Sequence, residues 1–360
     1  MSTLSRMRVL LRSSSLPLAL LGLASSGAAQ GPVFAEPREI SAEVGPAELH
    51  AVDLDGDGDV DLVSNDTSVD TRFAIHENLG GSFAAAVVLG PPSTYYPWRI
   101  AVGDLDGDGR ADLVSAATVG SSYRIQWERN VSGPGIQFVP GGDVAPPTGF
   151  ELARDLEVVD LDGDGHLDVV ASASAGSSSS APGAISWFQN LGGGVFAPEA
   201  PVGPGSELTP ADVDGDGDAD LVVYEVTGAL RWIENQGGGA FGGPTLISDE
   251  VEVIGPLRCA DLDGDGDLDV LAGNPEGEVV WFANDGAGTF SPAVSSGAGL
   301  APNGVLATGD LDGDGDADVL SGSLYGVAEV AWYENRSSAV VGLNYCAAHP
   351  NSTGAAGELR

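Results

Sequence analysis

The sequence predicts an all-β protein in which one unit of about fifty residues occurs six times. The first observation is a nine-residue acidic segment, Asp-Leu-Asp-Gly-Asp-Gly-x-x-Asp with one Leu replaced by Val, which begins at residues 53, 104, 160, 212, 261 and 310. The second is the spacing of these copies, which is 51, 56, 52, 49 and 49 residues. A period this regular indicates one supersecondary unit that is stacked or arranged in a ring.

Each acidic segment predicts a metal-binding loop. In the first copy, Asp53, Asp55 and Asp57 alternate with other residues, so their carboxylates can converge on one side. Gly58 permits a sharp bend. After it, Asp59 is expected to bind through its backbone carbonyl, and Asp61 is expected to supply a fourth carboxylate. Calcium accepts six to eight oxygen ligands in flexible geometry, magnesium demands a stricter octahedron, and zinc prefers His or Cys. The loops therefore predict calcium, with up to six ions, one in each repeat.

The residues after each segment indicate that the loops join strands. An EF-hand or dockerin loop closes with a carboxylate near position twelve and continues into a helix. Here position twelve is occupied by Ser64, Ser115, Ala171, Val223, Ala272 and Ser321, and none is acidic. Each segment is instead followed by a short aliphatic pair, such as Leu62-Val63 or Val169-Val170, which is typical of a buried strand.

A second pattern follows in each unit. A tryptophan precedes an asparagine by three residues at Trp127/Asn130, Trp187/Asn190, Trp232/Asn235, Trp281/Asn284 and Trp332/Asn335, with Ile75/Asn78 as a variant first copy. Most copies continue into a glycine-rich turn and a phenylalanine, as at Phe83, Phe196, Phe241 and Phe290. Such aromatic residues could form a platform for stacking sugars, but we expect most of them to be core residues between neighbouring sheets.

These motifs resemble the FG-GAP/VCBS repeat family, whose best-known members form the β-propeller head of integrin α subunits. The resemblance covers about residues 32 to 336 and is most specific in the six acidic loops. It implies that each repeat forms about one four-stranded blade and that the acidic loop is a calcium-binding hairpin. It also implies that positions one, three, five and nine bind through side chains and position seven through its backbone oxygen.

The predicted metal ligands follow residue by residue. They are Asp53, Asp55, Asp57, Asp59 and Asp61; Asp104, Asp106, Asp108, Arg110 and Asp112; Asp160, Asp162, Asp164, His166 and Asp168; Asp212, Asp214, Asp216, Asp218 and Asp220; Asp261, Asp263, Asp265, Asp267 and Asp269; and Asp310, Asp312, Asp314, Asp316 and Asp318. Integrin heads have seven blades and metal loops in only some of them, whereas here six repeats all carry complete loops. We therefore expect a β-propeller of six four-stranded blades, with a seven-bladed closure as the alternative.

Composition favours an extracellular setting. Residues 1–29 combine three arginines, an apolar stretch from Leu16 to Leu23 and a small-residue end before Gln30, which predicts a cleaved signal peptide. No later segment is long enough to span a membrane. We expect the protein to be secreted, extracellular or at the cell surface, or else periplasmic. The lone pair Cys259 and Cys346 indicates no disulfide framework, and we expect Cys259 to be a buried thiol.

The net negative charge of the chain makes negatively charged partners unfavourable. All fourteen basic residues are arginine, and three lie in the signal segment, so the remainder has 11 basic and 53 acidic residues and a net charge of −42. Six calcium ions would leave about −30. Nucleic acid and a bare anionic membrane are therefore poor partners.

The function that these observations favour is non-catalytic. We expect a binding or adhesion module, at residues 30–336, for an extracellular protein or polysaccharide ligand; the alternative is a carbohydrate-active enzyme of the polysaccharide lyase kind, or a lectin. No Ser/His/Asp pattern or other nucleophile motif points to catalysis. Tyr95, Tyr96, Trp98 and Arg99 form an aromatic and basic cluster for which packing is favoured over ligand binding. Residues 172–183 are expected to form a solvated loop, and residues 337–360 a tail that is either a truncated module or disordered.

Overall fold

The computed structural model describes residues 46–66, 73–80, 82–89, 95–119, 122–133, 135–145, 153–174, 183–250, 256–274, 278–299, 305–310, 315–322, 330–333 and 335. All of them belong to one compact unit, Pro37–Arg360, which is separate from Met1–Glu36. The expected signal peptide, the tail at 337–360, Cys346 and most of the enlarged loop at 172–183 lie outside the described residues. No helix within the described ranges is long and apolar enough to cross a membrane.

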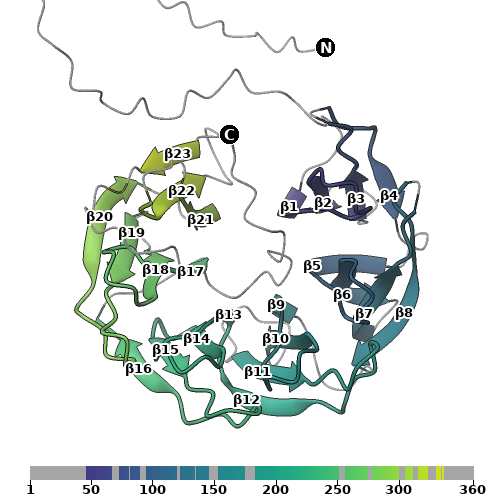
Figure 1. Ribbon diagram of the computed structural model, residues 1–360. Coiled ribbons are helices and arrows are strands. Elements are labelled where there is room, and N and C mark those ends of the chain that lie inside the picture. The colour runs from purple at the N-terminus through teal and green to yellow at the C-terminus, as the bar shows by residue number, and fades with distance from the viewer. Residues whose placement is uncertain are drawn as a thin grey trace, which may run out of the picture. The chain divides into compact units, whose positions relative to one another are not determined.

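The described residues form antiparallel strands in five four-stranded sheets and one three-stranded sheet (Figure 1). The first sheet consists of β1 (Pro46–Val52), β2 (Asp61–Asp66), β3 (Phe73–His76) and β4 (Val87–Leu89). The second consists of β5 (Tyr95–Gly103), β6 (Asp112–Val119), β7 (Ser122–Asn130) and β8 (Phe138–Ala145). The third consists of β9 (Ala153–Val159), β10 (Asp168–Ser174), β11 (Gly183–Phe188) and β12 (Ala200–Pro204).

The later sheets repeat this order. The fourth consists of β13 (Glu207–Ala211), β14 (Asp220–Tyr224), β15 (Leu230–Ile233) and β16 (Thr245–Ser248). The fifth consists of β17 (Leu257–Ala260), β18 (Asp269–Gly273), β19 (Glu278–Phe282) and β20 (Val294–Gly299). The sixth consists of β21 (Val305–Gly309), β22 (Asp318–Gly322) and β23 (Val330–Tyr333). In every sheet the acidic segment lies between the first and second strands, as expected.

The sheets are the blades of a β-propeller. Their first strands lie around a common axis and their fourth strands lie outermost (Figure 1). Each inner strand contacts the inner strand of the next blade, from β1 against β5 to β17 against β21. The prediction of an all-β propeller is therefore confirmed.

The predicted number of four-stranded blades was wrong. Five blades have four strands, and the sixth sheet has three strands among the residues that the structure describes. Those residues form neither a sixth four-stranded blade nor a seventh sheet. The physical reason lies after Asn335, where the chain lacks the glycine-rich turn and phenylalanine that lead to the fourth strand in most earlier repeats. Six acidic loops therefore do not imply six complete blades.

The hydrophobic core lies between neighbouring blades. One cluster joins Val114 and Trp127 of the second blade to Leu156 and Phe188 of the third, and the partly buried Phe196 packs against it. The Trp187 ring meets the Phe241 ring of the following blade edge-on, with centroids 6.1 Å apart and planes at 79°. The buried positions of Trp127 and Trp232, 5% and 6% exposed, are those of core residues. Cys259 is also buried, as expected.

The glycine-rich turns accommodate these tryptophans. Gly194, Gly239 and Gly288 have φ of +71°, +72° and +71°. A Cβ atom on each would overlap the indole ring of the preceding blade, which belongs to Trp127, Trp187 and Trp232 respectively. The tryptophan of one repeat and the glycine turn of the next are therefore two halves of one contact, which explains why both recur with the same period.

Replacement of Gly239 by Ala tests this contact. The new methyl group would overlap the Trp187 ring at a left-handed φ, so we expect the free energy of unfolding to fall by about 2–4 kcal/mol. Gly243→Ala is the matched control, because a Cβ there meets no atom within 4 Å. Urea unfolding of both variants measures the difference, and equal midpoints would contradict the proposed contact.

Candidate metal centre

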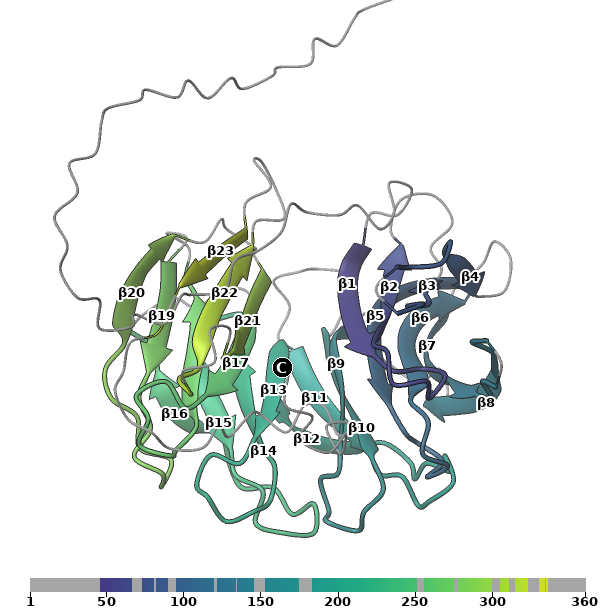
Figure 2. The same ribbon diagram turned by 45° about the horizontal axis from the view of Figure 1, so that its top comes forward.

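The acidic loops all lie at the same end of the inner strands. Each one connects the first strand of a blade to the second, so the loop that follows β1 has counterparts after β5, β9, β13, β17 and β21. Because the inner strands contact one another side by side, the loops are neighbours around the axis (Figure 2). One short segment therefore recurs at one face of the propeller.

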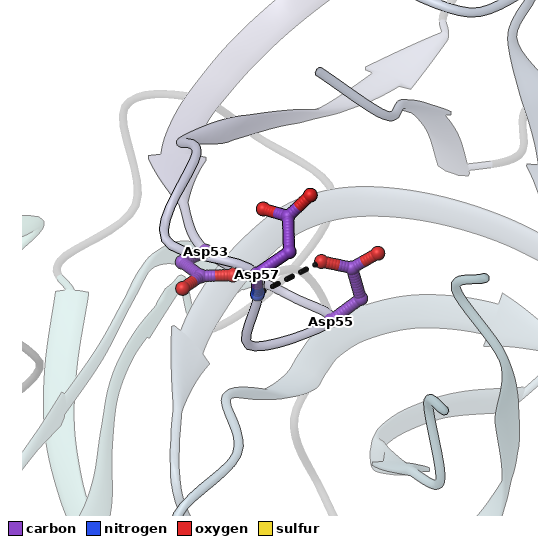
Figure 3. Close-up of side chains that lie close together, drawn as sticks. All are labelled: Asp53, Asp55 and Asp57. Atoms are coloured by element: carbon purple, nitrogen blue, oxygen red, sulfur yellow. Dashed lines mark hydrogen bonds between the residues drawn. The ribbon is translucent and has the colours of Figure 1, made fainter. Parts of the chain in front are cut away.

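Hydrogen bonds inside each loop set the direction of the carboxylates. The N–H groups of Gly56 and Gly58 donate to the two oxygens of Asp53, at 2.8 and 3.0 Å. The N–H of Asp57 donates to Asp55 Oδ1 at 3.3 Å (Figure 3). Both glycines have positive φ, 77° and 93°, which side chains with a Cβ rarely adopt. The glycines of the motif thus curl the backbone around the acidic side chains.

The structure brings three carboxylates together in each of five loops. In every group, one oxygen from each residue lies within 4.8 Å of the others. The groups are Asp53, Asp55 and Asp57; Asp104, Asp106 and Asp108; Asp160, Asp162 and Asp168; Asp212, Asp214 and Asp216; and Asp261, Asp263 and Asp265. In the third group Asp168 takes the place of Asp164, and the side chains at position seven belong to none of the five groups, so the backbone role of that position stays a prediction. In the sixth loop, residues 311–314 lie outside the described part, so its predicted ligands Asp312 and Asp314 stay untested.

The spacing of the oxygens would allow one shared cation in each of the five groups. Calcium–oxygen bonds are about 2.3–2.6 Å long, so two ligands on opposite sides of an ion are about 5 Å apart. Oxygens within 4.8 Å of one another can therefore share an ion. A carbonyl at position seven and water would complete the six to eight ligands that calcium requires.

The ninth-position aspartates have a second role that the motif alone did not reveal. Asp61 is fully buried, and its oxygens accept N–H groups from Leu54 at 2.9 Å and Asn78 at 2.7 Å. The same two bonds recur at Asp112, Asp168, Asp220 and Asp269. Only in the third loop does this residue join the carboxylate group, and its role as a ligand stays a prediction in every loop.

Burial makes the negative charge at position nine costly. Desolvation raises the pKa of Asp112, Asp220 and Asp269 to about 7, and of Asp168 to about 6. The donated N–H groups oppose this rise, and the neighbouring loop carboxylates add to it in each case. A bound cation would favour the ionised form by the opposite electrostatic effect.

The asparagine of the Trp-x-x-Asn pattern joins the loops of adjacent blades. The Nδ2 group of Asn190 donates to the carbonyl of Leu105, in the preceding blade's loop, at 2.7 Å, and to that of Leu167, in its own loop, at 2.9 Å. Asn130, Asn235, Asn284 and Asn335 make the equivalent pair of bonds. The sequence showed the period of these asparagines but not their partners in the preceding loops. Those partners lie 71 to 85 residues away.

The second loop differs from the others in its charge. Arg129 contacts Asp106 at 2.5 Å and Asp108 at 3.3 Å, and Arg110 contacts Asp108 at 3.0 Å. Two guanidinium groups therefore lie against two of the predicted ligands. The five carboxylate groups share one design but are not electrostatically equivalent.

A separate group of charged residues lies along the inner strands and was missed by the sequence analysis. Glu48, Arg99, Asp155 and Glu207 each stand five residues before the first aspartate of a loop, in β1, β5, β9 and β13. We call these four residues the axial belt. The signal was present in the sequence, because a charged residue recurs at the same register in strands that otherwise supply core residues.

Burial and neighbouring charges shift the pKa values of the acidic residues in the axial belt. Desolvation raises the pKa of Glu48 to about 7, against the opposing effect of Arg99. It also raises the pKa of Glu207 to about 7, to which Asp155 adds, while Arg99, Arg258 and Arg154 lower it. The pKa of Asp155 is likewise raised by burial. Charged groups from five blades therefore interact near the axis.

The sequence comparisons identify the family. The model of the FG-GAP-like repeat matches residues 53–115, 160–223, 212–272 and 261–321, more than half of the chain. The chain therefore belongs to the FG-GAP-like repeat family. No curated protein matches it.

The solved structures that are similar to this chain include the following three. The Photorhabdus luminescens Tc holotoxin pore has 21% identity and a TM-score of 0.48, and the match covers 86% of this chain and 15% of that one. BBS1N in complex with ARL6DN has 16% identity and a TM-score of 0.45, with 84% and 95% covered. The Bacillus licheniformis rhamnogalacturonan lyase PL11 has 15% identity and a TM-score of 0.43, with 84% and 65% covered. The chain thus spans a small part of the first of these proteins.

Replacement of Asn235 by Ala tests the bridge between loops. The change removes the donor shared by the buried carbonyls of Leu161 and Ala219, and each unpaired carbonyl costs about 1–3 kcal/mol. We expect the free energy of unfolding to fall by about 2–5 kcal/mol. Gln236→Ala, at the adjacent exposed position, is the control and should change it by less than about 0.5 kcal/mol. Similar losses in both variants, measured by chemical denaturation, would refute the bridge.

The raised pKa of Glu207 predicts a pH dependence of stability. The neutral form contributes stability that is complete below the ordinary pKa of 4.5 and is lost as pH rises through about 7. In saturating calcium, the melting temperature of the wild type should therefore fall between pH 5 and pH 8, and that of Glu207→Gln should fall less. Glu250→Gln, at an exposed position, should follow the wild type. Equal slopes for Glu207→Gln and the wild type would show that Glu207 does not titrate in this range.

Proposed function

We propose that this protein is a secreted calcium-binding β-propeller that acts as a non-catalytic binding or adhesion module for an extracellular protein or glycan. The observation that carries the proposal is the set of five loops, each with three carboxylate oxygens within 4.8 Å. The asparagine bonds between adjacent loops support it, because they place the metal loops at the joints between blades. Calcium then acts on the scaffold, and recognition takes place elsewhere on the propeller.

Charge repulsion gives calcium its role in this proposal. Two carboxylates about 4 Å apart repel by roughly 4 kcal/mol at an effective dielectric constant near 20. Three such groups in one loop oppose the conformation that the glycines and Asx-type bonds favour. A divalent cation turns this repulsion into attraction. Weak sites repeated along the chain are suited to the millimolar calcium outside cells.

The localisation rests on the amino-terminal sequence. Residues 1–29 have the basic, apolar and small-residue regions of a signal peptide. We place the protein outside the cytoplasm, in the medium, at the cell surface or in the periplasm. The high acidic content suits this setting, because a net charge of −42 after Ala29 keeps the chain away from nucleic acid and anionic lipid.

A carbohydrate-active enzyme is the second candidate, and the axial belt is the observation that favours it. Glu48 and Glu207 have pKa values near 7, as a general acid or base requires, and arginines lie within electrostatic range. The two candidates differ in one measurement. An enzyme would release unsaturated or shortened products from an acidic polysaccharide at a rate that Glu207→Gln reduces, whereas a binding module would release none.

Removal of calcium tests the proposed scaffold. At a calcium concentration one hundred times Kd, each site adds about 2.7 kcal/mol, so excess chelator should lower the melting temperature by at least about 10 °C. Elemental analysis of the calcium-saturated protein should find several ions per chain. Asp214→Asn should lower the count by about one, and Asp249→Asn, at an exposed position outside the loops, should not. Unchanged melting in chelator together with no stoichiometric calcium would reject the scaffold role.

A further inference from the structure

The residue before the motif asparagine has the same backbone anchor in successive blades. In the second, third and fourth blades, the N–H of the asparagine donates to the buried ninth-position aspartate of its own loop at 2.7 Å. This bond holds the preceding residue, which is Arg129, Gln189 or Glu234, at an equivalent place beside the loop. The asparagine stays constant while the residue before it varies, so this residue can give each loop a different charge.

In two blades this side chain bonds to the aspartate at position three of the loop. Gln189 donates from Nε2 to Asp162 Oδ2 at 2.5 Å in the third blade. Arg129 contacts Asp106 Oδ2 through its Nε, also at 2.5 Å, in the second. The same contact from two residue types shows that the position itself faces the carboxylate group of the loop.

Arg129 bridges two carboxylates of the second loop. Its Nη2 contacts Asp108 Oδ2 at 3.3 Å, and Nη1 of Arg110 contacts the same oxygen at 3.0 Å. The Oδ1 atoms of Asp106 and Asp108 accept the backbone N–H groups of Asp108 and Arg110, at 3.2 and 3.1 Å. All four oxygens of these two aspartates are therefore engaged by the chain itself.

This arrangement does not fit a calcium ion. Asp106 and Asp108 belong to the carboxylate group of the second loop, so a shared cation would compete with the guanidinium groups for the same carboxylates. The ion would also be repelled by two positive charges in direct contact with its ligands. The side chain of Asp106 is only 8% exposed, so solvent screens its pairing with Arg129 weakly.

The fourth loop carries the opposite charge at the same two places. Asp218 stands at position seven, where the second loop has Arg110, and Glu234 stands where the second loop has Arg129. Desolvation is the largest cause of the raised pKa of Asp214, the position-three aspartate, and the charge of Glu234 adds to it. Glu234 therefore adds negative charge where Arg129 adds positive charge.

We propose that the guanidinium of Arg129 takes the place of the metal ion in the second loop, so that this loop binds no calcium while the fourth loop binds it. This inference rests on the proposed calcium scaffold and assigns the residue that decides whether a loop needs an ion. The second loop then keeps its conformation at calcium concentrations too low to fill the others.

An exchange of residues between the second and fourth loops tests the inference. Arg110→Asp combined with Arg129→Glu gives the second loop the residues of the fourth at these two positions. We expect elemental analysis in millimolar calcium to find about one ion per chain more than in the wild type, and about one fewer in Glu234→Arg. Arg124→Glu is the control, because Arg124 lies on the same strand, β7, and pairs with Asp143 outside the loops at 3.4 Å. It should keep the wild-type count, and melting temperatures establish that each variant is folded.

Hydrogen exchange in excess chelator gives a second readout that needs no bound ion. The amides of residues 104–112 should be more protected than those of residues 212–220 in the wild type. Arg129→Ala should raise exchange over residues 104–112 by at least about threefold and leave residues 212–220 unchanged.

Two results would overturn the inference and leave the proposed scaffold standing. A folded double variant with the wild-type ion count would show that the two arginines do not keep an ion out of the second loop. A folded Glu234→Arg with the wild-type count would show that the position before the asparagine does not control binding. A wild type without stoichiometric calcium would instead reject the scaffold. Exchange then decides on Arg129, and unchanged exchange over residues 104–112 in Arg129→Ala would overturn its role as the cation of the loop.

Discussion

The buried hydrogen bonds between the ninth-position aspartate and the Trp-x-x-Asn asparagine are the interaction on which the rest of the structure depends. Asp168 accepts N–H groups from Leu161, in the loop, and from Asn190, after the third strand. The side chain of Asn190 then donates to carbonyls in its own loop and in the preceding one. One aspartate and one asparagine therefore join the loop, the blade and the blade interface, and the unit repeats around the axis.

This connection changes how the metal loops are understood. If each loop contacted only its own hairpin, the loss of an ion from one loop would not affect the adjacent blades. Here the carbonyl at position two of each loop, such as Leu105, accepts a bond from the next blade, and the N–H of the same residue donates to the ninth-position aspartate. An ion bound in one loop would therefore also order an acceptor for the next blade. The tryptophan and glycine contacts, such as Trp187 against Gly239, reinforce the same interfaces from the apolar side.

The two ends of the inner strands differ in their charged residues. At one end, repeated acidic loops meet the requirements of a hard cation, with oxygen ligands and glycines that permit positive φ. At the other end, the axial belt changes from blade to blade, from Glu48 through Arg99 and Asp155 to Glu207. Repetition suits a scaffold, since every joint needs the same contacts.

The sequence by itself determined the all-β repeat, the positions of the acidic loops, the strands that follow them and the recurring aromatic residues, because each depends on residues close together in the chain. It failed on the count of four-stranded blades, since six loops say nothing about whether a fourth strand follows Asn335. Only the tertiary structure decided that Asn190 bonds to Leu105 of the preceding blade. That contact joins residues 85 positions apart, and its distance depends on how neighbouring blades pack.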